Sequence, residues 1–495
     1  MNILNNNRIS VLNISRSCFY LAATLVGASL VVMSHAYGQS FSRNGDAAKI
    51  KMRDQSVELS LKVKDSFTFA AVGDIIEMQP FTKMGDPSVQ KLVNILRSAD
   101  FTVANMESMI VDFDTYTGPR GANLATKEVA DDLAAMGIKM VTKANNHTFD
   151  GGEQGLLENF RQLERVGIIH VGAGKNLSEA RMPRYYQTGK GLAGMVGIYA
   201  DSSLTSPSGG DGATYLVDGF GGKAGNNALK LQIYRGVTVD QMKQLRLMRD
   251  SINLRRVEVD NPIDLNTEEK AGSLDLFDTH FVVSDKPGEL YYEMNHNDEQ
   301  DIMRNIKTGK QFSDFMVATI HWHQNRYAFQ HYSFDHYPAA YQIKLAHEAI
   351  DNGADAFTAH GVHTIKGVEI YKGKPIFYGL SNFVFQMQIM PAPYVNPTRD
   401  PGAGEVNEVR WAWLQNKVNL EALLTTSHFE NGHLTEVRIY PVDLGQNFRV
   451  GSQVGIPKSP NSEIANKILK EVQKYSEPFG TKITIEDDVG VIRIP

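Results

Sequence analysis

The sequence almost lacks cysteine. Among its 495 residues the single cysteine is Cys18, which lies in an apolar segment near the N-terminus. A chain without that segment can form no disulfide, no thiolate nucleophile and no cysteine-ligated zinc site. Any metal site must then be built from nitrogen and oxygen ligands.

The sequence also lacks an excess of basic residues. It has 50 lysines and arginines against 56 aspartates and glutamates, which gives a formal net charge of −6. A nucleic-acid partner is not expected, because proteins that bind nucleic acid usually carry a basic excess. Internal repeats and low-complexity segments are absent as well. A composition of 42% hydrophobic and 21% charged residues is typical of a globular chain with one large domain or a few smaller ones.

The N-terminus has the pattern of a secretory signal peptide. Arg8 and Arg16 precede the apolar run CFYLAATLVGASLVVM, and small residues follow in SHAYGQS. We predict cleavage after Gly38, so that residues 1–38 are removed and the protein is periplasmic or secreted. The alternative is an uncleaved membrane anchor, because the run approaches the ~18 residues that a membrane span needs.

After a polar linker at residues 39–65, the sequence alternates between buried strands and amphipathic helices. Apolar runs rich in β-branched and aromatic residues end in polar ones in SFTFAAVGD, FTVANMES, KMVTKANNH, FMVATIHWH and DAFTAHGVH. Strands that alternate with helices predict an α/β fold. We assign residues 66–450 to this domain, residues 202–312 to an insertion that shapes the cleft, and residues 451–495 to a C-terminal helix and strands packed on the core.

The ends of these strands carry carboxylate, amide and imidazole side chains. In an α/β sheet, ligands bind just beyond the carboxyl ends of the strands. The residues at the strand ends are Asp74, Asn105, Glu107, Asn145, Asn146, His147, His321, His323, His360 and His363. This mixture of oxygen and nitrogen donors suits a divalent ion such as Zn, Mn or Fe, so we expect a metal site at this edge.

Several of these residues also have a purely structural interpretation when they are taken singly. Asp74 after a glycine is typical of a turn or a helix N-cap, and Asn145 and Asn146 are ordinary turn formers. Glu107 is equally suited to cap a helix or to pair with an arginine. A lone histidine such as His147 is more often a hydrogen-bonded structural residue. Their joint occurrence at strand ends is what favours the metal site.

Two histidine pairs are more specific. His321 and His323 alternate along a strand, so both imidazoles face the same side of the sheet. A glycine follows His360 and lets the backbone turn, so that the imidazoles of His360 and His363 converge on one centre.

Basic residues and a histidine-rich loop near these strands are candidate contacts for an anionic substrate. A guanidinium binds carboxylate or phosphate through two hydrogen bonds. The stretch RYAFQHYSFDHYP follows a predicted ligand strand and is typical of a specificity loop. A solvated surface charge or ordinary loop packing is the alternative for each residue. The predicted substrate contacts are Arg120, Lys143, Asn145, Arg326, His331 and His336.

The motifs FAAVGDI, ADFTVANMES, KANNHTFDGGEQGL, VGAGKNLSEAR, ATIHWH and GADAFTAHGVHTIKGVEIYKGKPIFYGLSNF resemble the bacterial CapA family of capsule synthesis, associated with poly-γ-glutamate. The resemblance spans roughly Phe67 to Phe385, in order, with the insertion in between. It implies a four-layer αββα sandwich, because the CapA family is similar in fold to calcineurin-like metallophosphoesterases.

The same resemblance implies one or two metal ions at the strand ends. His147 then resembles the imidazole that protonates a leaving group. The implied metal ligands are Asp74, Glu107, Asn146, His321, His360 and His363.

The sequence departs from the related patterns at three places. Ile76 stands where phosphoesterases have a histidine, which bears on whether the site holds two metals. Glu107 stands where phosphoesterases have an aspartate. After Trp322 the CapA group usually has a glycine and then a glutamate, whereas this chain has His323 and Asn325, so its site is expected to bind metal or substrate differently.

These observations predict an exported metal-dependent hydrolase that attacks a phosphoester or an amide of an anionic, carboxylate-rich small molecule or polymer. One alternative is a non-catalytic envelope protein that binds or exports a polymer such as poly-γ-glutamate. A second alternative is a metal-dependent lyase on a small carboxylated substrate, in which His323 or a tyrosine takes a proton. Contact with a membrane is expected only through an uncleaved signal segment.

Overall fold

The computed structural model describes residues 59–119, 123–201, 222–251, 272–327, 335–387, 416–446 and 453–494. The predicted signal peptide, residues 1–38, lies outside these residues, as do Arg120 and His331. In the part of the chain that is described, none of the helices combines the length and the apolar character that a membrane crossing needs.

The first β-sheet has nine strands in the described chain and is built around the long strand β1 (Ser66–Ile76). β1 pairs with β2 and β19 in parallel and with β20 in antiparallel orientation. The sheet runs in the order β22 (Thr484–Glu486), β23 (Val489–Arg493), β21 (His433–Asp443), β20 (Glu421–Glu430), β1, β2 (Phe101–Met106), β5 (Met140–Thr142) and β6 (Ile169–Val171), with β19 (Asn382–Phe385) beside the end of β1.

The second β-sheet has ten strands in the described chain, with β9 (Gly191–Asp201) and β15 (Phe315–His321) parallel at its centre. Its order is β12 (Ser273–Leu276), β13 (Thr279–Val283), β11 (Ala228–Val237), β9, β15, β16 (Ala356–His360), β18 (Lys374–Phe377) and β17 (Val368–Tyr371), with β8 (Arg184–Thr188) beside β9 and β14 (Leu290–Met294) beside β11.

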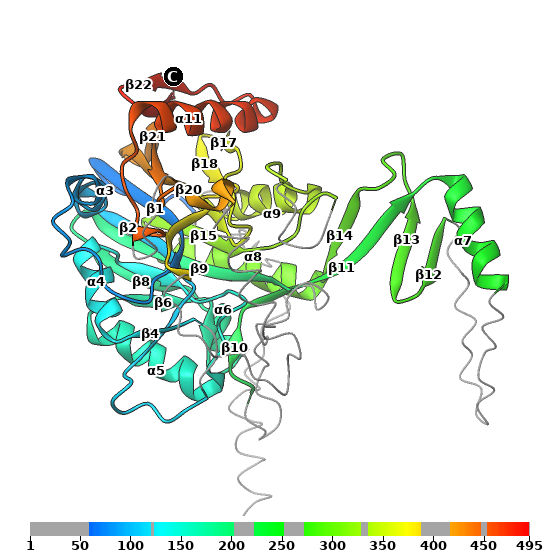
Figure 1. The fold of residues 1–495 in the computed structure, drawn as a ribbon, viewed down its shortest axis with the longest axis horizontal. Helices are drawn as coiled ribbons and strands as arrows, with labels where there is room; N and C mark the ends of the chain where they lie inside the picture. The colour runs from blue at the N-terminus through cyan, green and yellow to red at the C-terminus, as the bar shows by residue number, and fades with distance from the viewer. Residues whose placement is uncertain are drawn as a thin grey trace, which may run out of the picture. The chain divides into compact units, whose positions relative to one another are not determined.

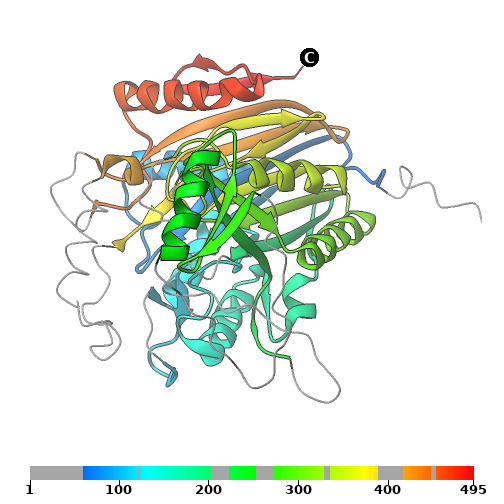
Figure 2. The same cartoon turned by 90° about the vertical axis from the view of Figure 1, so that its right-hand side faces the viewer.

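The two sheets pack face to face, and helices cover their outer faces (Figure 1). Between the sheets, the rings of Phe67 and Phe69 lie 5.0 and 5.3 Å from the ring of Phe315. Figure 2 shows the same layers from the side. The covering helices are α3 (Pro87–Ser98) and α4 (Glu128–Met136) on the first sheet, and α8 (His296–Gln311) and α9 (Ala340–Asp351) on the second. The predicted α/β sandwich is therefore confirmed.

Local sequence explains where α3 begins and which face it buries. Pro87 takes the first helical position, where a backbone N–H would have no partner within the helix, so its absence costs nothing. The Asp86 carboxylate caps the helix by accepting the N–H of Ser88. The apolar residues of α3 recur at the spacing of one helix face and pack on the first sheet. The buried residues of that face are Val89, Leu92, Val93 and Leu96.

The segment predicted as an insertion, residues 202–312, contributes strands to the second sheet. Its described part contains β10 (Gly225–Asn226), which pairs with β7 (Ala173–Gly174), and α7 (Val239–Ser251), which contacts β12 and β13. The first residues of β11 pair with β9, whereas its later residues pair with β13 and β14 (Figure 1). A small separate core lies under α7.

The C-terminal helix α11 (Ser462–Ser476) packs on β21 and β17 (Figure 1). Its buried residues Ile468, Leu469 and Val472 belong to the core between the two sheets. The remaining described elements are β3 (Met109–Val111) paired with β4 (Leu124–Thr126), α5 (Gly152–Arg165), α6 (Leu177–Arg181), and the 3₁₀ turns η2 (Lys417–Leu420) and η4 (Glu477–Phe479).

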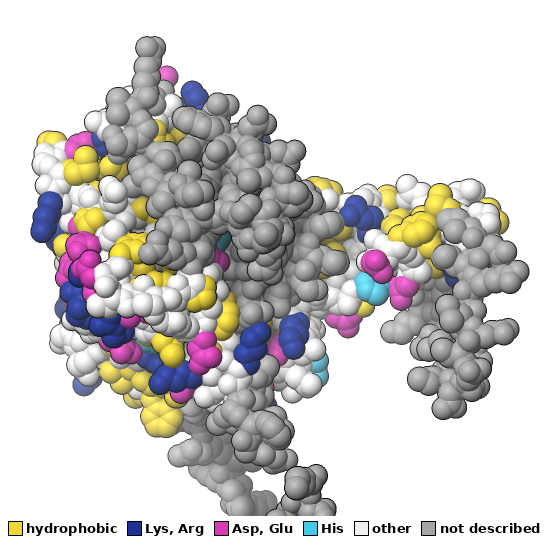
Figure 3. Space-filling model, turned by 60° about the horizontal axis from the view of Figure 1, so that its bottom comes forward, with side chains coloured by type: hydrophobic (Ala, Val, Ile, Leu, Met, Phe, Trp, Pro, Cys, Tyr) yellow, Lys and Arg dark blue, Asp and Glu magenta, His cyan; other side chains and the backbone are white. Residues whose placement is uncertain are grey.

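Charges of both signs are mixed on the described surface. On the face drawn in Figure 3, Lys and Arg side chains lie beside Asp and Glu side chains. Ion pairs account for part of this mixture: Lys127 pairs with Asp112 and Asp114, and Arg165 pairs with Asp131.

Candidate metal centre

The strand ends meet at one edge of the sandwich, as the sequence predicts. Asp74 at the end of β1 is in register with Asn105 of β2 and with Asn382 of β19. In the second sheet, His321 of β15 is in register with His360 of β16. Parallel strands end on the same side of a sheet, so these polar residues face a common region.

Asp74 lies at the middle of the cluster. Its Oδ1 atom is 3.2 Å from His360 Nδ1 and 3.6 Å from His321 Nδ1, and its Oδ2 atom is 3.3 Å from His363 Nδ1. The backbone N–H of Gly361 donates to Oδ2 at 2.9 Å. All four side chains are buried. An aspartate surrounded by three imidazoles is suited to bind a cation together with them.

Two sets of side chains in the described chain could hold an ion. The ligand atoms of Asp74, His321 and His360 lie within 4.8 Å of one another, and so do those of Asp74, Glu107 and His363. Because Asp74 belongs to both sets, the arrangement accommodates one ion or two ions that share this carboxylate. Five of the six predicted ligands are thus brought together.

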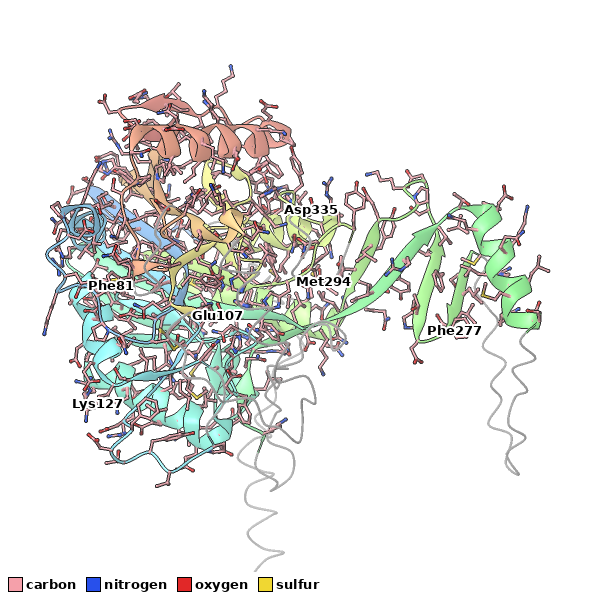
Figure 4. The ribbon with its side chains drawn as sticks, in the orientation of Figure 1. Phe81, Glu107, Lys127, Phe277, Met294 and Asp335 are labelled. Carbon is pink, nitrogen blue, oxygen red and sulfur yellow. The ribbon has the colours of Figure 1, made fainter. Side chains whose placement is uncertain are left out.

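Two of the predicted ligands have buried acceptor atoms without a hydrogen-bond partner among the described residues. These atoms are both carboxylate oxygens of Glu107 and the Oδ1 atom of Asn146. A buried polar atom that makes no hydrogen bond costs about 1–3 kcal/mol, so natural proteins rarely leave one. A cation at the strand ends would satisfy these oxygens, and the residues present therefore fit a divalent metal. Figure 4 labels Glu107 within the sandwich.

The electrostatics of the cluster favour a ligand role. Burial opposes ionisation of Asp74, but its interactions with the imidazoles of His321, His360 and His363 outweigh this effect and hold the pKa of Asp74 well below its usual value. Burial lowers the pKa of His321 to about 3, so its ring is neutral and offers a lone pair. Burial, reinforced by the charge of Asp74, raises the pKa of Glu107 well above its usual value. A bound cation would relieve that repulsion.

His147 lies at the rim of the cluster. Its Nε2 atom is 3.8 Å from Glu107 Oε1, and its Nδ1 atom is 2.7 Å from Asp150 Oδ2. Since a carboxylate accepts hydrogen bonds, Nδ1 carries a proton and Nε2 faces the centre. The His147 side chain is 18% exposed, whereas the carboxyl of Glu107 is fully buried. The imidazole therefore stands between the buried ligands and the solvent.

Two glycines make the close approach of the strands possible. A Cβ atom at Gly73 would lie 1.8 Å from the carbonyl oxygen of Ser381, beside β19. Gly361 has a φ of +105°, and a Cβ atom there would lie 2.6 Å from the carbonyl oxygen of Trp322. The predicted glycine turn between His360 and His363 is thus present in the structure.

Lys143 and Asn145 have structural partners, which differs from the predicted contact with substrate. The fully buried ammonium of Lys143 donates to the carbonyls of Met106 at 2.9 Å and Ser108 at 3.1 Å. The Asn145 side chain donates to the carbonyl of Met106 at 3.1 Å and accepts the N–H of His147 at 3.0 Å. Both residues tie the turn after β5 to the end of β2, because strand ends leave backbone carbonyls that need donors.

Arg326 and His336 also have partners within the protein. The Arg326 guanidinium makes several hydrogen bonds with Asp335, the shortest of them 2.9 Å from Nη2 to Oδ1. The His336 ring stacks on Tyr475 with centroids 4.3 Å apart, and its Nδ1 atom donates to the carbonyl of Ile365 at 2.8 Å. These contacts hold the ends of the segment predicted as a specificity loop, whose residues 328–334, with His331, lie outside the described chain.

Asn105, Asn382 and Asp150 contact the predicted ligands and His147, and from the sequence none of the three is assigned a ligand, catalytic or substrate-binding role. Asn105 donates to Asp74 Oδ1 at 2.8 Å, and Asn382 accepts from His363 Nδ1 at 2.6 Å. The sequence shows Asn105 as an amide at a strand end, and it shows Asp150 as an acid three residues after His147. Nothing local distinguishes Asn382, because its role depends on the parallel pairing of β19 with β1.

The fold and this cluster define an α/β sandwich protein with an aspartate-centred candidate metal site at its strand ends. Residues 68–387 match the family described as bacterial capsule synthesis protein PGA_cap. The chain belongs to this family, which confirms the resemblance drawn from the sequence motifs.

Relatives of this chain include an uncharacterized protein and proteins named for PGA biosynthesis and for polyglutamine synthesis. The uncharacterized protein y4sH of Sinorhizobium fredii is 33% identical over 87% of this chain and 94% of its own length. The PGA biosynthesis protein CapA of Bacillus subtilis is 24% identical over 65% of this chain and 64% of its own length. A protein of Mycobacterium tuberculosis with the name probable polyglutamine synthesis accessory protein is 24% identical over 51% of this chain and 46% of its own length.

One solved structure aligns with much of the chain. It is described as a putative 5′-nucleotidase from Staphylococcus aureus, and it aligns with 78% of this chain and 56% of its own at 12% identity and a TM-score of 0.36. A similarity that distant carries no argument about activity.

Proposed function

We propose that this protein is a metal-dependent hydrolase whose substrate is an anionic molecule or polymer with a phosphoester or amide bond. The observation that carries this proposal is that Asp74 belongs to both buried ligand sets, together with the buried acceptors of Glu107 and Asn146 that have no hydrogen-bond partner in the described part of the chain. A structural ion would need only one closed set of ligands. His147 is the residue through which the cluster reaches solvent, since its side chain is 18% exposed.

The residues around the centre have distinct roles in this proposal. Asp74, Glu107, Asn146, His321, His360 and His363 would hold the ion or ions. A divalent ion there supplies Lewis-acid chemistry and lowers the pKa of a bound water toward 7.

His147 is placed to give a proton from Nε2 to the departing oxygen or nitrogen. Asp150 keeps the proton on Nδ1 and orients the ring through the 2.7 Å contact. A site that only stores an ion has no need of such a pair, so this pair supports the hydrolase.

The names of the relatives bear on the substrate. CapA of Bacillus subtilis is named for PGA biosynthesis, and the Mycobacterium tuberculosis relative is named as an accessory protein. A carboxylate-rich polymer such as poly-γ-glutamate is therefore our first candidate, and its bonds are amides. We further infer, from the signal pattern in residues 1–38, that the protein is exported and meets this polymer in the envelope.

The proposal is tested with purified protein lacking residues 1–38. Elemental analysis should find zinc, manganese or iron at one or two ions per chain. Hydrolysis of aryl phosphoesters and γ-glutamyl anilides should depend on the added ion and stop with a chelator.

A matched pair of variants separates catalysis from metal binding. His147→Asn should keep the metal content and reduce turnover by about 10²–10⁴, the range typical of a lost general acid. Asp74→Asn should lose both the metal and the turnover. Full activity in His147→Asn would contradict the role of this imidazole.

A non-catalytic role in binding or exporting an anionic polymer is the second candidate. The observation in its favour is Ile76, which is buried and apolar where phosphoesterases carry a ligand histidine. Binding of poly-γ-glutamate that requires the metal, without hydrolysis of any substrate tested, would support this candidate. A metal-dependent lyase is tested in the same screen through the release of an unsaturated product.

A further inference from the structure

His321 makes contacts through both of its ring nitrogens. Its Nδ1 atom faces Asp74 and His360, and its Nε2 atom lies 3.1 Å from Nε2 of His323. The two rings are nearly perpendicular, with an interplanar angle of 83° and centroids 4.8 Å apart. Both rings are buried, at 0% and 2% exposure. Two ring nitrogens at this distance, buried from water, form a hydrogen bond in which one nitrogen donates its proton and the other accepts it.

The direction of this hydrogen bond follows from the asparagines behind the centre. Asn145 Nδ2 donates to the carbonyl of Met106 at 3.1 Å and to Asn105 Oδ1 at 3.0 Å. The backbone N–H of His147 donates to Asn145 Oδ1, which fixes the orientation of the Asn145 amide. Because Asn105 accepts through its oxygen, its Nδ2 atom is the one that faces the centre.

The Asn105 amide then determines the tautomer of His321. Asn105 Nδ2 donates to Asp74 Oδ1 at 2.8 Å and contacts His321 Nδ1 at 3.2 Å. An N–H that points at a ring nitrogen requires a lone pair on that nitrogen, so Nδ1 carries no proton. A ring with a bare Nδ1 must carry its proton on Nε2, and the acceptor within reach is His323 Nε2.

We propose that His323 is a positioning residue of the metal centre: it accepts the Nε2 proton of His321 and thereby keeps Nδ1 of His321, which faces Asp74, free of a proton. This deepens the proposed function and rests on it. The role differs from the proton acceptor expected for His323, because its Nε2 lone pair is engaged by His321 and its ring is buried. A ligand imidazole whose second nitrogen is held in this way keeps its tautomer and orientation.

The backbone around His323 is held firmly enough for such a role. Its N–H donates to Gln324 Oε1 at 3.2 Å, and its carbonyl accepts from Asn325 Nδ2 at 3.3 Å. Gln324 is fixed in turn, since Tyr341 donates to its Oε1 at 2.8 Å and its Nε2 donates to the carbonyl of Ala200 at 3.2 Å. The acceptor is therefore anchored to the second sheet and to α9.

Two substitutions at this position separate packing from hydrogen bonding. His323→Phe keeps a buried ring but offers no acceptor. His323→Gln places an amide oxygen near the position of Nε2 and keeps the acceptor. We expect the phenylalanine variant to bind Zn²⁺ or Mn²⁺ about 10- to 100-fold more weakly than the wild type, as is typical of a lost second-layer partner. The glutamine variant should bind the same ion with an affinity within a few-fold of the wild type.

The tautomer itself is measured without metal or substrate. Long-range ¹H–¹⁵N spectra of metal-free protein labelled with ¹⁵N-histidine, with His321 assigned by its absence in His321→Gln, should show the proton on Nε2. His323→Phe should weaken this preference, and His323→Gln should keep it. Circular dichroism and thermal melts establish that each variant is folded.

The outcomes are distinct. A proton on Nδ1 of His321 in the wild type, or unchanged metal affinity and tautomer in His323→Phe, would overturn the inference. Failure of the wild type to bind any divalent ion would overturn the proposed function instead, and the metal-free spectra would still decide the pairing of His321 with His323.

Discussion

At the scale of single residues, the buried polar atoms tell most about this protein. Asp74 gathers three imidazoles and a backbone N–H, whereas Glu107 and Asn146 keep buried oxygens that have no hydrogen-bond partner among the described residues. Hydrogen-bonded buried groups stabilise the fold, whereas a buried acceptor that makes no hydrogen bond is suited to bind an ion or a water molecule. The contrast between neighbours, rather than any one residue, is what indicates a metal site.

Gly361 is expected to tolerate no side chain. Its φ of +105° and the 2.6 Å approach of a Cβ atom to the Trp322 carbonyl both oppose alanine. Gly361→Ala should destabilise the fold by more than the ~1–3 kcal/mol of an unfavourable backbone conformation. Gly373→Ala is the matched control, because Gly373 has a φ of +73° and no atom of the described residues lies within 4 Å of its Cβ position. If urea unfolding gave the same loss of stability for Gly361→Ala and Gly373→Ala, the clash at Gly361 would be absent.

Glu77 should make stability depend on pH. Burial, together with the neighbouring Asp132, raises the pKa of Glu77 well above its ordinary value of 4.5. The folded state thus holds this proton more tightly than the unfolded state. Its stabilising contribution is complete below pH 4.5 and is lost as the pH rises through the folded pKa.

Glu77→Gln tests this dependence, because the amide keeps the shape and carries no charge. The variant should be more stable than the wild type at pH 8, and its advantage should shrink toward pH 5, as measured by urea unfolding at both values. Glu477→Gln, at an exposed site, should leave the free energy of unfolding unchanged at both pH values. An advantage that is the same at both pH values would mean that Glu77 does not titrate with folding.

At the scale of elements, α11 belongs to the same folding unit as the sandwich. Leu469 is fully buried in the core between the sheets, although it lies more than eighty positions beyond the last residue of the family match, which covers residues 68–387. Leu469→Ala should cost about 2–5 kcal/mol, as is typical of a buried leucine. Lys470→Ala, on the exposed side of the same helix, should cost less than about 0.5 kcal/mol. A small loss for Leu469→Ala in thermal or urea unfolding would mean that α11 docks only loosely.

At the scale of the whole molecule, metal binding should stabilise the folded state. The predicted ligands come from β1, β15 and β16 and from the segments after β2, β5 and β16, so only the folded chain assembles them. At a free ion concentration 100 times its Kd, the gain is about 2.7 kcal/mol. The Tm of the wild type should therefore rise with Zn²⁺ or Mn²⁺ and fall back with chelator.

Matched aspartate variants make this measurement specific. Asp74→Asn should show no metal-dependent rise in Tm, because the shared ligand is gone. Asp114→Asn, at a side chain that is 82% exposed, should behave as the wild type does. A rise of the same size in Asp74→Asn would place the stabilising ion elsewhere.

Much of the fold and part of the site could be predicted from sequence. The runs that became β1, β2, β5, β15 and β16 are apolar and β-branched, and their polar ends follow directly in the chain. The substrate contacts were less predictable, because burial of Lys143 and the pairing of Arg326 with Asp335 depend on distant segments. A basic residue near a site has the same sequence pattern whether its charge faces the substrate or a backbone carbonyl.

By itself the sequence determined the α/β alternation, the nitrogen and oxygen donors at the strand ends, and the glycine turn between His360 and His363, because these depend on periodicity and on residue type. Only the tertiary structure decided that Asp74 is shared between two ligand sets and that His323 lies behind His321. The reason is physical: the hydrogen bond from Gly361 to Asp74 joins residues 287 positions apart. Contacts of that range are set by the register of packed sheets, which no local pattern records.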